Sequence, residues 1–158
     1  MGQVAVKKAS ALLLGLGLLL FCSPFERERA ADAFESLNGR CIRLLSETTV
    51  LRPAAEHKAF RPYLDRSISK IDKLVTTLPA GTEIRIARVV YEQSFEYTAV
   101  TVLARVPGVS DEVSASLLFT PQWLTAATRI QERRETRASS ELLKNALDEQ
   151  MAEWCDRE

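Results

Sequence analysis

Apolar and polar residues alternate in three closely spaced segments in the middle of the chain. In residues 83–92, the apolar Ile84 and Ile86 alternate with the charged Glu83 and Arg85. Such alternation, interrupted by short polar turns, predicts an antiparallel meander. The strands expected from this pattern are 83–92, 95–106 and 112–120. An earlier segment, residues 40–51, is rich in β-branched and apolar residues and predicts a further strand.

Two other regions have the apolar spacing of three and four that marks one face of a helix. The first is residues 67–78, with an apolar face composed of Ile68, Ile71, Leu74, Val75 and Leu78. The second begins at Thr120-Pro121, where a hydroxyl cap precedes proline at the first helical position. Its apolar stripe contains Trp123, is interrupted in residues 131–137 and returns as far as Trp154. We therefore expect two C-terminal helices that cover a sheet.

Four strands followed by a long helical region predict a small α+β domain. We expect a small antiparallel sheet or an open SH3-like barrel of four to five strands. A C-terminal helical region packs on it, and an N-terminal hydrophobic helix precedes it. The length of 158 residues suits one such domain. The expected order is a signal peptide or anchor at 1–25, a helical stalk or linker at 26–39, a β-rich core at 40–120 and C-terminal helices packed on that core at 121–158.

The N-terminal segment decides which compartment the rest of the chain enters. Lys7 and Lys8 precede an uncharged run from Ala9 to Phe25. A short basic region before an apolar stretch is typical of an export signal. The run of about 17 residues is also near the minimum that spans a bilayer as a helix. The sequence therefore predicts contact with the inner membrane through residues 9–25, with the remainder on the periplasmic side.

The processing of this segment has several possible outcomes. Ala31-Asp32-Ala33 has the small-x-small form of a cleavage site, but four charged residues separate it from the apolar run. A cut after Ser23 would leave Pro24 next to the cleaved bond. Cys22 allows a lipid-modified cysteine, although the preceding Phe21 is bulky for that signal. We rank a retained anchor first, a cleaved signal second, a lipoprotein third and an ordinary buried helix last.

Two cysteines, Cys41 and Cys155, lie outside the apolar run. In an oxidising compartment two such cysteines indicate one disulfide, with two unpaired buried thiols as the alternative. Closing a loop of about 100 residues stabilises a fold by about 4–5 kcal/mol in the chain-entropy model. The bridge would hold the C-terminal helix against the first strand.

Charge and motifs narrow the chemistry that we expect. Lys and Arg number 21 and Asp and Glu number 21, so the near-neutral chain lacks the positive field of a nucleic-acid-binding protein. The sequence contains no Gly-x-Ser-x-Gly nucleophile motif and no phosphate-binding loop. One histidine, His57, and two distant cysteines do not form a zinc set. We expect no metal, no small-molecule cofactor and no enzymatic activity.

A binding surface is the remaining candidate for function. Residues 53–66 contain two prolines and mixed charge, which is typical of a long surface loop. Aromatic and arginine side chains together are the composition favoured at binding hot spots. The candidate partner-binding residues are His57, Phe60, Arg61, Tyr63 and Arg66. The alternative is that Phe60 and Tyr63 only pin the loop to the core.

These observations favour a non-catalytic exported protein whose partner is another protein of the cell envelope. An inhibitor or an immunity protein against an exported toxin or hydrolase is slightly favoured, because a neutral domain needs only one complementary face to block a target. The first alternative is a membrane-tethered accessory of a secretion or cell-wall assembly complex. The second is a cell-wall glycan-binding module that uses Tyr63, Tyr91 and Tyr97.

Overall fold

The computed structural model describes residues 27–54, 61–67, 71–94 and 97–155. In this part of the chain a mixed sheet of nine strands dominates, and helices are few. The elements, with η marking 3-10 helices, are β1 (Arg27–Ala30), η1 (Asp32–Leu37), β2 (Cys41–Leu44), β3 (Thr48–Arg52), β4 (Tyr63–Asp65), β5 (Lys73–Leu78), β6 (Glu83–Gln93), β7 (Thr98–Arg105), β8 (Val113–Ser114), η2 (Ser116–Leu118), α2 (Pro121–Glu132), α3 (Ser140–Lys144) and β9 (Ala152–Trp154).

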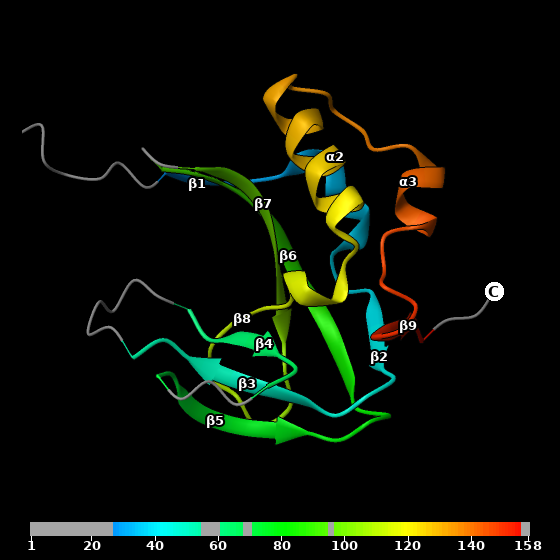
Figure 1. Ribbon diagram of the computed structural model, residues 1–158. Coiled ribbons are helices and arrows are strands. Elements are labelled where there is room, and N and C mark those ends of the chain that lie inside the picture. The colour runs from blue at the N-terminus through cyan, green and yellow to red at the C-terminus, as the bar shows by residue number, and fades with distance from the viewer. Residues whose placement is uncertain (1–26, 55–60, 68–70, 95–96, 156–158) are drawn as a thin grey trace, which may run out of the picture.

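The nine strands are arranged around the long strand β6. The order along the sheet is β5-β3-β4-β8-β7-β6-β2-β9, and β1 pairs with β6 outside this path. One side of β6 pairs with β7, while its other side pairs with β2 near Glu83 and with β1 near Gln93. In Figure 1, β3, β4 and β5 lie together at the bottom of the view and run across the direction of β6.

The main core lies between the sheet and α2. Thr120 caps this helix, since its hydroxyl oxygen accepts a 3.2 Å hydrogen bond from the backbone N–H of Trp123. The predicted helix start at Thr120-Pro121 is confirmed. The buried Trp123 ring packs edge-on against Phe34 and tilted against Phe119, with ring centroids 5.3 and 4.9 Å apart. Trp123 is therefore a core residue, as its position on the apolar stripe predicts.

The expectation of a small sheet or open barrel of four to five strands with a C-terminal helical region is wrong. The sheet has nine strands, and the last of them, β9, takes the place of the expected terminal helix. In the described residues after Ser139, which end at Cys155, the short α3 is the one helix. The strand β9 pairs with β2, so a partner remote in sequence overrides the local helical spacing.

The predicted helix at residues 67–78 is also wrong, because Lys73–Leu78 is the strand β5. This strand pairs with β3, and its β-branched Val75, Thr76 and Thr77 suit an extended backbone. Of the expected apolar face, Leu78 is buried, but Ile71, Leu74 and Val75 are exposed. Ile68 lies outside the described residues.

Other boundaries differ as well. Residues 27–37, expected to be helical, form β1 and η1. The segment 40–51 is divided into two strands, β2 and β3, and most of 112–120 is occupied by the two-residue strand β8 and by η2. The expected N-terminal hydrophobic helix lies outside the described residues. Within the described ranges, no helix has the length and apolar character needed to cross a bilayer.

Candidate partner-binding site

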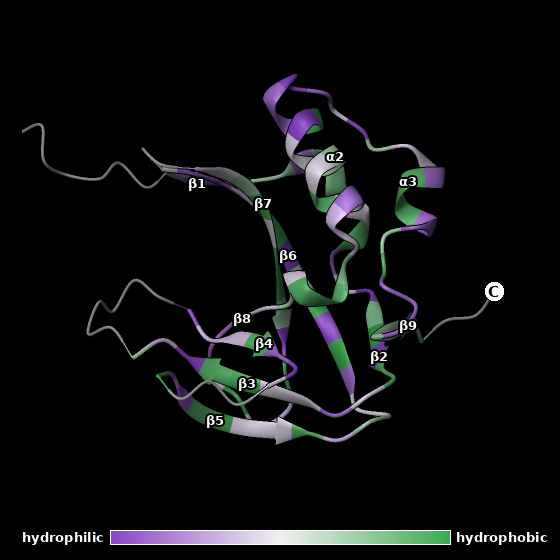
Figure 2. Ribbon diagram, in the orientation of Figure 1, coloured by the Kyte–Doolittle hydropathy of each residue, from purple (hydrophilic) through white to green (hydrophobic). Residues whose placement is uncertain are grey.

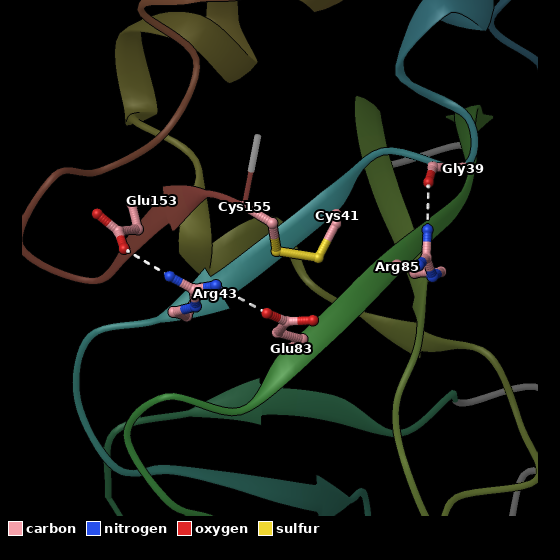
Figure 3. The surroundings of a disulfide bond; sticks show 7 residues. All are labelled: Gly39, Cys41, Arg43, Glu83, Arg85, Glu153 and Cys155. Atoms are coloured by element: carbon pink, nitrogen blue, oxygen red, sulfur yellow. Dashed lines mark hydrogen bonds and ion pairs between the residues drawn. A yellow bond between two sulfur atoms is a disulfide. The ribbon is translucent and has the colours of Figure 1, made fainter. Parts of the chain in front are cut away.

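A disulfide joins Cys41, at the start of β2, to Cys155, just after β9, and their Cα atoms are 5.3 Å apart. The predicted bridge is confirmed, although the segment that it holds against β2 is a strand rather than a helix. Figure 3 shows Arg43 beside the bridge, between Glu83 and Glu153 at 2.8 and 3.4 Å. These contacts hold β2, β6 and β9 together at one end of the sheet.

Three residues of types that can bind a metal ion lie close together at the disulfide. Carboxylate and sulfur atoms of Glu83, Cys41 and Cys155 lie within 4.8 Å of one another. A metal binds cysteine as thiolate, and both sulfurs are bonded to each other here. The arrangement therefore serves as a covalent clamp.

A network of ion pairs connects β1 to the strands around it. Its members are Glu28, Arg61, Arg88, Glu92 and Glu112. Glu28 and Glu92 lie directly opposite each other in the β1–β6 ladder, where two like charges repel. Arg61 bonds to both carboxylates, with a distance of 3.1 Å to Glu92, and so compensates both charges.

The arginines keep Glu28 ionised. Partial burial raises the pKa of this carboxyl group, but the hydrogen bonds and charges of Arg61 and Arg88 together lower it below its usual value of 4.5. A carboxyl group with a lowered pKa is a poor proton donor near neutral pH. The network is therefore suited to joining strands rather than to acid catalysis.

Asp72 joins two described segments that flank residues 55–60, one just after β3 and the other at the start of β4. One oxygen of its carboxylate accepts a 3.1 Å hydrogen bond from the backbone N–H of Ala54, and the other accepts a hydrogen bond from the Tyr63 hydroxyl group. The hydrogen bond to Asp72, together with burial and nearby negative charge, raises the pKa of Tyr63 to about 12. Asp72 thus connects the two points between which the predicted recognition loop runs.

The predicted site residues fall into two groups. His57 and Phe60 lie outside the described residues. Arg61, Tyr63 and Arg66 are described, and each contacts another part of the fold: Arg61 the carboxylates, Tyr63 Asp72, and the Arg66 Nε the sulfur of Met151. Arg61 and Tyr63 come shortly after residues 55–60, whereas Arg66 follows β4 at its other end.

The three tyrosines proposed for glycan binding are in different environments. Tyr91 is buried, and the Arg29 guanidinium lies 4.6 Å from its ring centroid. Tyr63 is half-buried and bonded to Asp72, whereas 52% of Tyr97 is exposed. The three rings therefore do not form one exposed platform.

An exposed apolar group beside Asp72, at the start of β5, is the feature that sequence reasoning missed. It consists of Ile71, Leu74 and Val75, which are 80%, 42% and 38% exposed and are called the β5 patch below. Figure 2 shows the apolar stretch near the start of β5. The helical spacing of these residues indicated a core face, so the sequence pattern itself concealed the patch. The run of Val75, Thr76 and Thr77 is the signal that could have indicated a strand.

The geometry of β5 exposes two consecutive apolar side chains. Val50 pairs with Thr76 and Leu51 with Leu74, so Val75 is an extra residue in a β-bulge. A regular strand would point Leu74 and Val75 to opposite faces, whereas a bulge re-aims a side chain. Within the described residues β5 pairs with β3 alone and forms one end of the sheet.

No family model matches this sequence, and no curated protein or solved structure matches it either.

Proposed function

We propose that this is a non-catalytic, membrane-anchored protein of the cell envelope that binds another envelope protein through the β5 patch. The observation that carries the proposal is the exposure of Ile71, Leu74 and Val75 at a sheet edge. Exposed apolar residues gathered at one site favour a protein contact. A sheet edge also offers backbone groups to another chain.

The disulfide supports the location of the domain outside the cytoplasm. Stable structural disulfides are typical of oxidising compartments, and the Cys41–Cys155 bridge closes nearly the whole described domain. Lys7 and Lys8 would then stay on the cytoplasmic side, with residues 9–25 in the inner membrane.

The position of β1 favours a retained anchor over cleavage at Ala31-Asp32-Ala33. Ala31 and Ala33 are buried, and a cut after Ala33 would remove the whole of β1 with its partners on β6. It would also remove Glu28, which pairs with both Arg61 and Arg88. Release by a cut closer to Ser23 is the alternative, since it would leave this strand in the domain.

The hydrogen bonds of Asp72 support a surface beside the patch that is ordered before a partner binds. Asp72, next to Ile71 in sequence, bonds to Ala54 and Tyr63, so the patch and the loop ends are joined. A surface that is ordered before binding loses less conformational entropy when a partner docks. His57, Phe60, Arg61, Tyr63 and Arg66 remain candidates for the outer part of this contact.

Capture experiments on the full chain in mild detergent test the proposal. We expect wild type to retain a partner from envelope extract in near-equal amount, and Leu74→Asn with Val75→Asn to lose it. Loss of a binding hot spot costs about 2 kcal/mol or more, which is a roughly thirty-fold loss of affinity. Leu45→Asn is the matched control, because Leu45 is a 43% exposed leucine near the other end of β5. Equal capture by all three proteins would contradict a role of the patch.

The identity of the captured protein separates the possible roles. An inhibitor or immunity protein, which we slightly favour, would retain a toxin or hydrolase and abolish its activity in the mixture. A tethered accessory would retain several components of one membrane complex. Binding to purified cell-wall glycan that is unaffected by the β5 substitutions would instead indicate a glycan-binding module.

A further inference from the structure

We propose that Tyr97, the residue just before β7, lies in the interface of the bilayer that holds residues 9–25. The bilayer surface is then a second binding partner of the domain and sets its orientation. This inference rests on the retained anchor of the proposed function. It concerns a different end of the molecule from the β5 patch.

The distance between the apolar run and the fold is short. Phe25 ends the run and Arg27 begins β1, so Glu26 is the whole linker. Two residue steps span at most about 7 Å, even when the chain is fully extended. A run that stays in the membrane therefore holds the start of β1 against the headgroup region.

The strand register determines which other segment reaches the membrane. Arg27 pairs with Gln93, and Gln93 pairs with Thr98 across the β6–β7 hairpin. Because β1 and β6 are antiparallel, the first residue of β1 lies beside the last residue of β6. The chain that precedes β1 therefore comes from the same end of the sheet as the connection between β6 and β7. Figure 1 shows the start of β1 and the start of β7 at the same end of the sheet.

Ser94 and Tyr97 lie beyond this row of paired residues, on the side of the apolar run. One further step along a strand is about 3.3 Å, which is within the reach of about 7 Å that the linker allows. An anchored domain therefore cannot move Tyr97 far from the membrane unless β1 separates from β6.

The chemistry of Tyr97 suits the interface. Its side chain is 52% exposed. Two hydrogen bonds join Tyr97 to Ser94 at the end of β6. The Ser94 backbone N–H donates to the Tyr97 carbonyl at 2.9 Å, and the Tyr97 backbone N–H donates to the Ser94 hydroxyl at 3.1 Å. Tyrosine is enriched at membrane–water interfaces, because its ring is apolar and its hydroxyl group stays hydrated.

Fluorescence quenching in vesicles tests the contact. The full chain carries Cys22→Ser and either Tyr97→Cys or Glu141→Cys, labelled with an environment-sensitive fluorophore. It is reconstituted into phosphatidylcholine and phosphatidylglycerol vesicles that contain nitroxide lipids. We expect the label at position 97 to shift to shorter wavelength and to lose emission to the nitroxide. The label at 141, on α3 at the opposite end of Figure 1, should do neither.

The outcomes separate the inference from the anchor on which it rests. Protein that floats with the vesicles but leaves the label at position 97 unquenched would overturn the membrane contact and leave the anchor standing. Protein that does not float would overturn both. Because a label can itself insert into lipid, hydrogen exchange of the unlabelled chain is the second measurement. Hydrogen exchange is compared between vesicles and detergent. A larger slowing at Tyr97 than at residues of α3 supports the contact, and an equal change at both sites contradicts it.

Discussion

Tyr63 and Asp72 form a residue-scale contact whose strength depends on pH. The folded chain raises the pKa of Tyr63 to about 12 from an ordinary value of 10.0, first because the hydroxyl group bonds to Asp72. Since the raised pKa favours the neutral phenol, its contribution to stability is complete below about pH 10. It is lost as the pH rises through about 12.

We therefore predict that Asp72→Asn lowers the pKa of Tyr63 toward 10.0 and removes this alkaline loss of stability. Tyrosinate absorbance during a pH titration measures the change, with Tyr63→Phe identifying the signal of this residue. Asp65→Asn is the control, because Asp65 is the smallest of the causes that raise the pKa. An unchanged titration in Asp72→Asn would show that the hydrogen bond does not control the phenol.

Arg61 illustrates how a residue type common in binding sites can serve the fold. It compensates Glu28 and Glu92, which lie opposite each other on β1 and β6. We predict that Arg61→Ala lowers the free energy of unfolding by about 1–2 kcal/mol, because two partly buried carboxylates lose a charged donor.

Urea denaturation of the wild type and of Arg61→Ala measures this loss. The exposed Arg137 provides the matched arginine, and Arg137→Ala should change stability by less than about 0.5 kcal/mol. If Arg61→Ala is as stable as wild type, Arg61 does not serve the fold and its role in recognition gains support.

The strand β5 leads to a prediction at the scale of the element. Leu78 is buried, whereas Leu74 is 42% exposed. We predict that Leu78→Ala costs about 2–5 kcal/mol because it leaves a cavity. Leu74→Ala should cost less than about 1 kcal/mol, since little apolar area is lost. Thermal or denaturant unfolding compares the two variants. A similar large loss of stability at both positions would contradict the exposed position of Leu74 and favour the helix that the sequence spacing indicated.

The strand β1 leads to a second element-scale prediction. Its pairing with β6 involves Arg27 to Ala30, and the buried Ala31 follows. A chain beginning at residue 34 should be less stable than one beginning at residue 27 by about 3–5 kcal/mol. Each backbone hydrogen bond contributes about 1 kcal/mol and the Glu28 ion pairs are lost as well. Equal unfolding midpoints of the two chains would contradict a structural role for β1.

At the scale of the whole molecule, the disulfide limits the unfolded chain. It joins residues that are 114 positions apart. We predict that Cys41→Ser with Cys155→Ser lowers the free energy of unfolding by about 4–5 kcal/mol, because the unfolded chain gains conformational entropy. Denaturation of the variant, and of wild type with and without a reductant, measures the effect. A cost below about 1 kcal/mol would show that the other contacts of β2 and β9 suffice.

Local sequence signals predicted the elements whose partners are close in the chain. Alternation identified the region of β6 and β7, which are joined by a short turn. The cap at Thr120 marked the start of α2. Neither signal depends on a distant partner, because alternation and capping act within a few residues. The same reasoning failed for β5 and β9, whose extended backbone is stabilised by β3 and β2.

The candidate site was predicted only in part for the same reason. Arg61 and Tyr63 were identified as arginine and tyrosine in a loop, but their contacts with Glu28 and Asp72 connect segments that the sequence pattern does not relate. The β5 patch was missed because an apolar spacing of three and four was interpreted as one face of a helix. Leu74 and Val75 lie in a bulged strand instead, where that spacing does not apply.

The sequence by itself indicated one disulfide, the central β6–β7 hairpin and the start of α2, because each signal depends on composition or on neighbouring residues. Only the tertiary structure decided that charged residues 27–30 and the apolar segments at 73–78 and 152–154 are strands. A strand forms hydrogen bonds with a separate segment, so its stability depends on an edge supplied by the rest of the fold.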